Sequence, residues 1–92
     1  MDRRSHSRDH PQILIVDDSR TNVAMIEGIL RAEGFHTLAA SDGSMARVMS
    51  RHEHPDLILL DVLMPGESGF ETCSLLKSDP ATTDIPIIFL SA

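Results

Sequence analysis

The chain has 92 residues, of which 41% are hydrophobic and 24% are charged, and its 14 acidic and 8 basic residues give a formal charge of −6. This length allows one small domain, and no apolar run approaches the ~20 residues of a membrane span, which argues against a membrane role. The acidic balance argues against direct nucleic-acid binding, which requires basic surface to neutralise phosphates. A single cysteine, Cys73, excludes an internal disulfide framework, and the N-terminus lacks the apolar core of a signal peptide, so we expect a cytoplasmic protein.

The first segment, residues 1–12 (MDRRSHSRDHPQ), mixes charges and histidines with a proline and has no apolar period. Such a composition is typical of a terminus that is not packed against the domain. We therefore expect a flexible N-terminal arm over residues 1–12 and one folded domain over residues 13–92.

The first predicted strand is followed by an amphipathic helix. Ile13 to Val16 is a continuous apolar run, typical of a strand that is buried on both faces. Five apolar residues then recur at helical spacing, and Gly34 follows where a helix would end. These five residues are Val23, Met25, Ile26, Ile29 and Leu30.

A second strand and helix follow in the same order. Residues His36 to Ala40 form a weaker strand pattern, and Ser41-Asp42-Gly43 has the composition of a turn. In the helix that follows, we expect Ala46, Val48 and Met49 to face inward. The alternation of strand and helix thus continues.

The last predicted elements are a strand, a helix and another strand. Pro55 ends the second helix, and Leu57 to Leu60 is an apolar third strand. Ser68 is a suitable N-cap for a third helix that runs to Lys77. Residues Ile85 to Leu90 (IPIIFL) then form a fourth apolar strand. Apolar strands separated by helices predict an α/β fold, a doubly wound parallel sheet with right-handed connections and helices on both faces.

Acidic residues stand at the ends of two of these strands. Asp17 and Asp18 directly follow the first strand, and Asp61 directly follows the third. In a flavodoxin-like sheet with strand order 2-1-3-4, these two strands are neighbours, and ligands bind at the carboxyl ends of the strands. We therefore expect the three carboxylates to share one pocket, where a hard cation such as Mg²⁺ would relieve their repulsion. Ser91, at the end of the fourth strand, would add a hydroxyl beside the same pocket.

This combination favours phosphoryl transfer to a carboxylate, because an aspartate can act as a nucleophile when a metal neutralises the incoming oxygens. A single acid after a strand is more often a helix cap or a turn former, and we assign Asp42, Asp79 and Asp84 to such roles. Two acids in tandem after one strand, a third after another strand and a hydroxyl after the fourth are harder to explain in that way.

Four separated stretches, ILIVDDS, SDG, PDLILLDVLMPGESG and IPIIFLSA, together resemble the receiver domain of bacterial two-component response regulators. The resemblance covers residues 13–92. It implies that Asp61 accepts a phosphoryl group from a phosphohistidine on a sensor histidine kinase or phosphotransfer protein. It also implies that Asp18 binds Mg²⁺ directly, that Asp17 acts largely through water, that the backbone carbonyl of Leu63 completes the metal shell, and that Ser91 is the switch hydroxyl. Such a domain phosphorylates and dephosphorylates itself and is not an enzyme that acts on an outside substrate.

The chain departs from this family at its C-terminal end. A receiver normally continues through a fourth helix, a fifth strand and a fifth helix, and a lysine after the fifth strand contacts the phosphoryl group. Here the sequence ends at Ala92, and Lys77 is its only lysine. We therefore expect a truncated receiver fold that can self-associate through an exposed fourth strand. The alternative function is an inactive truncated receiver that acts as a protein-interaction module.

Overall fold

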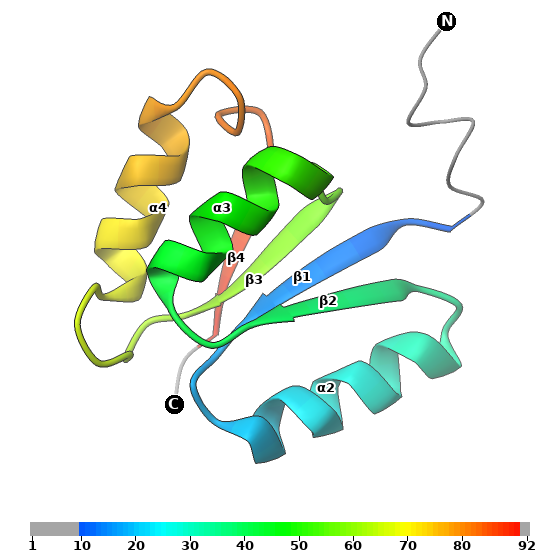
Figure 1. Cartoon of the computed structure of the whole chain (residues 1–92). Helices are drawn as coiled ribbons and strands as arrows, with labels where there is room; N and C mark the ends of the chain where they lie inside the picture. Colours follow the sequence, from blue (N-terminus) through cyan, green and yellow to red (C-terminus); the bar gives the residue numbers. More distant parts are fainter. Residues whose placement is uncertain (1–9, 91–92) are drawn as a thin grey trace, which may run out of the picture.

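The computed structural model describes residues 10–90, so that residues 1–9 of the expected arm and the expected switch residue Ser91 lie outside the described part. Four strands and three helices alternate along these residues (Figure 1). In chain order they are β1 (Gln12–Val16), α2 (Arg20–Ala32), β2 (His36–Ala40), α3 (Gly43–Glu53), β3 (Leu57–Asp61), α4 (Gly69–Ser78) and β4 (Ile87–Leu90). The predicted order of elements is confirmed.

The strands form one parallel sheet in the order β2-β1-β3-β4, which confirms the predicted fold class and strand order. β1 and β3 are central neighbours, and Val16 of β1 lies opposite Leu60 of β3. The residues that follow these two, Asp17 and Asp61, are therefore brought to the same edge of the sheet. This register is the part of the fold that positions the candidate site.

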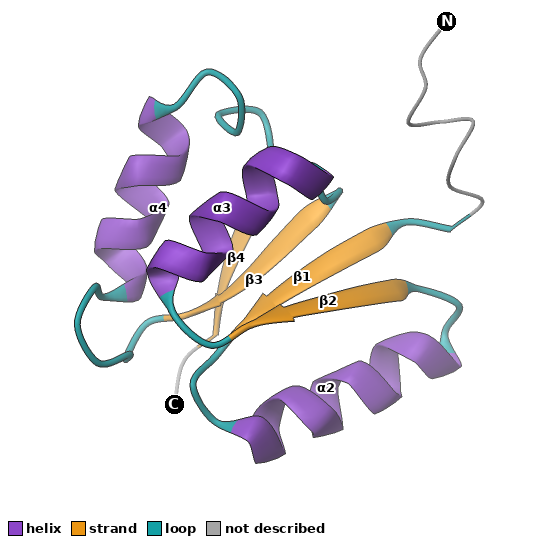
Figure 2. Cartoon of the chain, viewed as in Figure 1, coloured by secondary structure: helices purple, strands orange, loops and turns teal. Residues whose placement is uncertain are grey.

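Helices cover both faces of the sheet, as the alternation of elements predicts. Figure 2 shows α2 on one face and α3 with α4 on the other. The main hydrophobic core lies between the sheet and the pair α3 and α4, and it contains Leu14, Val16, Ala40, Ala46, Ile58, Leu60, Met64, Leu76 and Ile85. In contrast, no residue of α2 is fully buried. Within residues 10–90, no helix is long and apolar enough to cross a membrane.

The helix ends follow the capping residues that the sequence contains. Ser19 is the N-cap of α2, and Gly34, with φ +92°, follows the end of this helix in a left-handed conformation that glycine adopts without strain. Asp42 is the N-cap of α3 and accepts a hydrogen bond from the backbone of Met45. Ser68 caps α4 in a capping box with Glu71, which confirms the predicted start of the third helix.

Some details differ from the sequence-based expectations. Val48 is 54% exposed and does not face inward, because the inward face of α3 is formed by Ala46 and Ser50, one helical turn apart, with Met49 packed beside them. The strand β4 begins at Ile87, since Ile85 is held in the preceding turn by a hydrogen bond from its N–H to the carbonyl of Thr82. The first strand, β1, begins at Gln12, one residue before the predicted start at Ile13.

Candidate functional site

Three carboxylates meet at the carboxyl ends of β1 and β3. Asp17, Asp18 and Asp61 each offer one oxygen, and these atoms all lie within 4.8 Å of one another. The expectation that they share one place in the fold is therefore confirmed. Asp17 is buried, Asp61 is half-buried and Asp18 is exposed, so the cluster extends from the sheet edge to the surface.

The start of α2 fixes the side chain of Asp17. Its Oδ1 accepts a hydrogen bond of 2.9 Å from the backbone N–H of Ser19, and its Oδ2 accepts one of 3.3 Å from the side-chain amide of Asn22. Ser19 is also the N-cap of this helix. The helix that covers one face of the sheet thus also orients one of the three acids.

The surroundings of Asp61 affect its protonation. Burial raises the pKa of Asp61, and the negative charges of Asp17 and Asp18 raise it further. The backbone N–H of Leu63, which donates to Asp61 Oδ1 at 3.3 Å, acts in the opposite direction on this pKa. Because ionised acids repel one another here, a bound cation would be favoured at this position.

A cavity of about 360 Å³ opens beside the cluster. It lies between the start of α2, the loop after β3 and the end of β4, and its lining residues are Asp17, Asp18, Ser19, Asn22, Met25, Ile26, Asp61, Leu63 and Leu90. Leu63, the expected carbonyl ligand, therefore lies on the same cavity as the acids. The position of Ser91 falls outside the described residues, but its neighbour Leu90 lines the cavity.

The loop between β3 and α4 is held at both ends. The side chain of Met64 is buried in the core, and the N–H of Gly69 donates a 3.0 Å hydrogen bond back to the carbonyl of Val62. A side chain at Gly69 would collide with the backbone of Asp61 and Val62, so only glycine allows this close approach. This contact shapes the loop that follows Asp61.

The chemistry of the donor set fits Mg²⁺. The cluster contains oxygen ligands only, and Mg²⁺ prefers carboxylates, carbonyls and water over nitrogen or sulfur ligands. Among residues 10–90, this is the one group of three or more acidic, histidine or cysteine side chains whose atoms are close enough to hold an ion.

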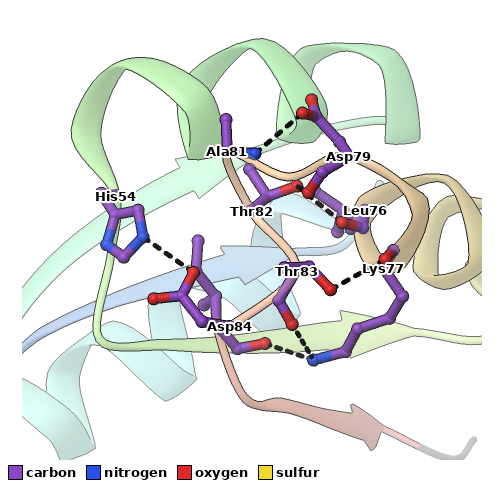
Figure 3. Close-up of polar contacts among 9 residues, drawn as sticks. His54, Leu76, Lys77, Asp79, Ala81, Thr82, Thr83 and Asp84 are labelled. Atoms are coloured by element: carbon purple, nitrogen blue, oxygen red, sulfur yellow. Dashed lines mark hydrogen bonds and ion pairs between the residues drawn. The ribbon is translucent and has the colours of Figure 1, made fainter.

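The single lysine of the chain lies elsewhere. Figure 3 shows Lys77 beside the connection between α4 and β4, where its Nζ donates hydrogen bonds of 3.2 Å to the carbonyl of Thr83 and 2.7 Å to the carbonyl of Ile85. In return, Thr83 Oγ1 donates to the carbonyl of Lys77 at 2.9 Å. Lys77 is in the last turn of α4, whereas the loop next to Asp61 leads into the first turn, so Lys77 does not occupy the place of the family lysine.

Sequence reasoning missed one group of polar residues close to the site. Glu67, in the loop after β3, forms an ion pair with Arg47 of α3 and accepts a hydrogen bond from Thr72 of α4. Arg47 and Glu67 are 20 residues apart; Glu67 lies within the quoted stretch PDLILLDVLMPGESG but was given no role there, and Arg47 lies outside all four stretches. Only the packing of α3 against α4 brings them together.

Comparisons with known proteins give a consistent result. A family model for the response regulator receiver domain matches residues 13–92. Response regulator PleD of Caulobacter vibrioides (strain NA1000 / CB15N) is 46% identical over 81 residues, which cover 88% of this chain and 18% of that protein. The chain thus spans less than a fifth of the length of this relative.

Two solved structures share the fold. The N-terminal domain of a response regulator receiver protein from Methanoculleus marisnigri JR1 matches with a TM-score of 0.88 and 38% identity, covering 89% of this chain and 67% of that chain. The receiver domain of sensor histidine kinase PA1611 from Pseudomonas aeruginosa PAO1 matches with a TM-score of 0.85 and 29% identity, covering 90% of this chain and 68% of that chain. The structure of PA1611 has a magnesium ion coordinated in its active site cleft.

The family match begins within β1 and extends over all the later elements, which confirms the resemblance seen in the sequence. Receiver domains are phosphoacceptor modules of two-component signal transduction that interact with histidine kinases, and they are not catalytic enzymes. The chain belongs to the response regulator receiver domain family.

Proposed function

We propose that Asp61 accepts a phosphoryl group from a phosphohistidine of a sensor histidine kinase or phosphotransfer protein. The observation that carries this proposal is the place of Asp61, which ends a central strand, lines an open cavity and lies beside two other carboxylates. An oxygen of Asp61 attacks the phosphorus, the P–O bond forms as the P–N bond breaks, and the imidazole leaves with the electron pair. The product is an aspartyl phosphate.

The same cluster would hold the Mg²⁺ ion. Asp18 and Asp61 are its direct carboxylate ligands in this proposal, Asp17 acts largely through water, and Leu63 contributes its backbone carbonyl. Bound Mg²⁺ neutralises negative charge on the phosphoryl oxygens and on the acids. The raised pKa of Asp61 supports this proposal, because the ionised cluster is unfavourable without a cation.

The partner kinase docks, in this proposal, beside the cavity along α2. Asn22, Met25 and Ile26 line the cavity together with the acids, and Met25 is 59% exposed. Exposed apolar residues next to a polar reacting centre are typical of a surface that binds a partner protein. We assign this activity to the cytoplasm, where two-component phosphotransfer takes place.

Ser91 is proposed as the switch hydroxyl that contacts the phosphoryl group. Leu90 lines the cavity at the end of β4, and Ser91 directly follows it in the sequence. We also propose self-association through β4, because among residues 10–90 this strand pairs with β3 alone and exposes Ile88 and Phe89.

A second candidate function is an interaction module that binds a kinase or another receiver without being phosphorylated. The observation that favours it is the position of Lys77, which holds the connection between α4 and β4. Within residues 10–90, no lysine lies beside the acidic cluster. In that case the acidic cavity would take part in binding a partner protein, and Asp61 would not be phosphorylated.

The test is the intact mass of the 92-residue chain after incubation with acetyl phosphate and Mg²⁺, with Asp61→Ala as the control. We expect a mass increase of one phosphoryl group in the wild-type chain, abolished by Asp61→Ala and by removal of Mg²⁺ with a chelator. If the wild-type chain is folded by circular dichroism and gains no phosphoryl group, the phosphoacceptor proposal is wrong and the interaction module is favoured.

A further inference from the structure

An ion pair ties the loop after β3 to helix α3. Glu67 receives two hydrogen bonds from the guanidinium of Arg47, of 3.2 Å from Nε to Oε2 and 2.9 Å from Nη2 to Oε1. Bidentate contacts between an arginine and a carboxylate fix the orientation of both groups as well as the distance between them. The side chains are 36% and 21% exposed, so that water screens this pair less than it would a fully exposed one.

A third residue and a glycine complete the arrangement. The hydroxyl of Thr72, which is fully buried in α4, donates a 2.6 Å hydrogen bond to Glu67 Oε2. Gly43, at the start of α3, lies so close that a Cβ there would collide with both Thr72 Oγ1 and Glu67 Oε2. Arg47 holds the pKa of Glu67 below its ordinary value, so this carboxylate is ionised at neutral pH. The Glu67 carboxylate therefore connects the loop to α3 and α4 at once.

The loop held in this way carries residues of the proposed metal site. It begins directly after Asp61 and includes Leu63, whose side chain is 70% exposed and whose backbone is not held by packing of that side chain. Pro65 and Gly66 are also exposed, and Gly66 has φ +77°. Between the buried Met64 and Ser68, the N-cap of α4, the side chain of Glu67 anchors this part of the loop through its contacts with Arg47 and Thr72.

We infer that Arg47 and Glu67 are positioning residues for the phosphoacceptor site, because their ion pair fixes the loop that places the Leu63 carbonyl beside Asp61. This inference rests on the proposed function. Neither residue belongs to the acidic cluster or lines the cavity beside it, so the pair acts through the loop. A ligand held in place before the ion binds loses less conformational freedom on binding, which favours tighter binding.

The chain offers a matched control on the same helix. Arg51 lies one turn after Arg47 in α3 and also forms an ion pair, at 3.0 Å from its Nε to Asp79 Oδ2. Asp79 is the C-cap of α4, at the end of the helix that is farthest from the loop after β3. Loss of the Arg51 pair therefore removes an arginine–carboxylate ion pair of the same helix α3 without releasing the loop after β3.

The experiment compares metal binding by the full 92-residue chain with that by Arg47→Ala, Glu67→Gln and Arg51→Ala. Mn²⁺, which takes the same oxygen ligands as Mg²⁺, is titrated, and the free ion is measured by electron paramagnetic resonance. We expect Arg47→Ala to weaken Mn²⁺ binding about tenfold, the lower end of the range for residues that support metal ligands. We expect Glu67→Gln to weaken Mn²⁺ binding as well, and Arg51→Ala to leave the Mn²⁺ affinity unchanged. Saturating Mg²⁺ restores the maximal rate of modification by acetyl phosphate in Arg47→Ala.

The outcomes separate this inference from the function on which it rests. If the wild-type chain binds no Mn²⁺, both the metal site and the positioning role are wrong. If the wild-type chain binds Mn²⁺ and both Arg47→Ala and Glu67→Gln bind it equally well, only the positioning role is wrong. Equal weakening by Arg51→Ala would also overturn it, because the effect would then come from general loss of packing. Should Arg47→Ala fail to fold by circular dichroism, the milder Glu67→Gln decides the result.

Discussion

At the end of β3, Asp61 carries a charge that is unfavourable in the absence of a cation. Its carboxylate lies within 4.8 Å of those of Asp17 and Asp18, and burial together with these charges raises its pKa above the ordinary value of 3.8. Since the folded-state pKa is the higher one, the ionised group lowers the free energy of unfolding at pH values above it. This cost disappears as the pH falls below 3.8. The repulsion that destabilises the metal-free chain also favours the binding of a cation.

The substitution Asp61→Asn should therefore stabilise the metal-free chain at pH 7. We expect the free energy of unfolding to rise by up to about 1 kcal/mol, the size of the interaction between neighbouring charges near a surface. The difference should shrink as the pH approaches 3.8, where the wild-type carboxyl becomes protonated. Saturating Mg²⁺ should reverse the order of stability, because the ion stabilises the folded wild-type chain by mass action and the neutral amide of the variant is a weaker ligand. Urea unfolding, monitored by circular dichroism, measures the free energy of unfolding of both chains with and without Mg²⁺. If Asp61→Asn is less stable than the wild-type chain without metal, the charge of Asp61 does not destabilise the fold.

At the scale of the elements, the loop after β3 depends on the backbone approaching itself closely. Gly69, which begins α4, lies against the backbone of Asp61 and Val62. Backbone atoms cannot move aside as the tip of a flexible side chain can, so an added methyl group displaces either the loop or the start of the helix. This contact joins the end of the loop to the residue that we propose as the phosphoacceptor.

We predict that Gly69→Ala lowers the free energy of unfolding by about 2 kcal/mol or more, as expected for overpacking of a tight contact. Gly28→Ala is the matched substitution, because Gly28 lies in the interior of α2 and an added Cβ would meet no atom within 4 Å beyond its chain neighbours and the backbone of its own helix. There, alanine should stabilise the chain by about 0.5–1 kcal/mol through its better helix propensity. Urea unfolding of both variants tests the pair. Equal effects of the two substitutions would show that the close approach at Gly69 is not a constraint.

The elements and the acidic cluster could be predicted from the sequence because their signals are local. Apolar runs mark the strands, and strand ends in a parallel sheet place Asp17, Asp18 and Asp61 together once β1 and β3 are neighbours. The inward assignment of Val48 was wrong because apolar character alone does not decide which side of a short helix faces the core. Packing of the smaller residues Ala46 and Ser50 against the sheet decides it instead.

The contacts between elements could not be predicted in the same way. The pairing of Arg47 with Glu67 depends on how α3 packs against α4, and no spacing in the sequence encodes this. The same is true of Lys77, whose bonds to Thr83 and Ile85 hold a connection that the sequence shows only as a polar turn. Interactions that depend on tertiary geometry therefore emerge only from the folded chain.

At the scale of the whole molecule, the two faces of the sheet differ. The face covered by α3 and α4 contains the main core, whereas α2 is the one described helix on the other face and has no fully buried residue. Large apolar side chains are exposed on α2 and on β4, an edge strand of the sheet formed by residues 10–90, among them Met25, Ile29 and Ile88. Exposed apolar surface beside an unpaired strand edge favours association between copies of a chain.

We therefore predict that the 92-residue polypeptide self-associates in a concentration-dependent manner and that Ile88→Lys weakens this association. Ile88 is 53% exposed in β4, so lysine can point into water there, while its charge opposes the pairing of two such strand edges. Ser74→Lys is the control, because it adds the same charge at an exposed position in α4. Sedimentation velocity over a range of concentrations distinguishes the chains. A wild-type chain that stays monomeric at every concentration, or an equal effect of both lysines, would show that β4 is not the surface through which copies associate.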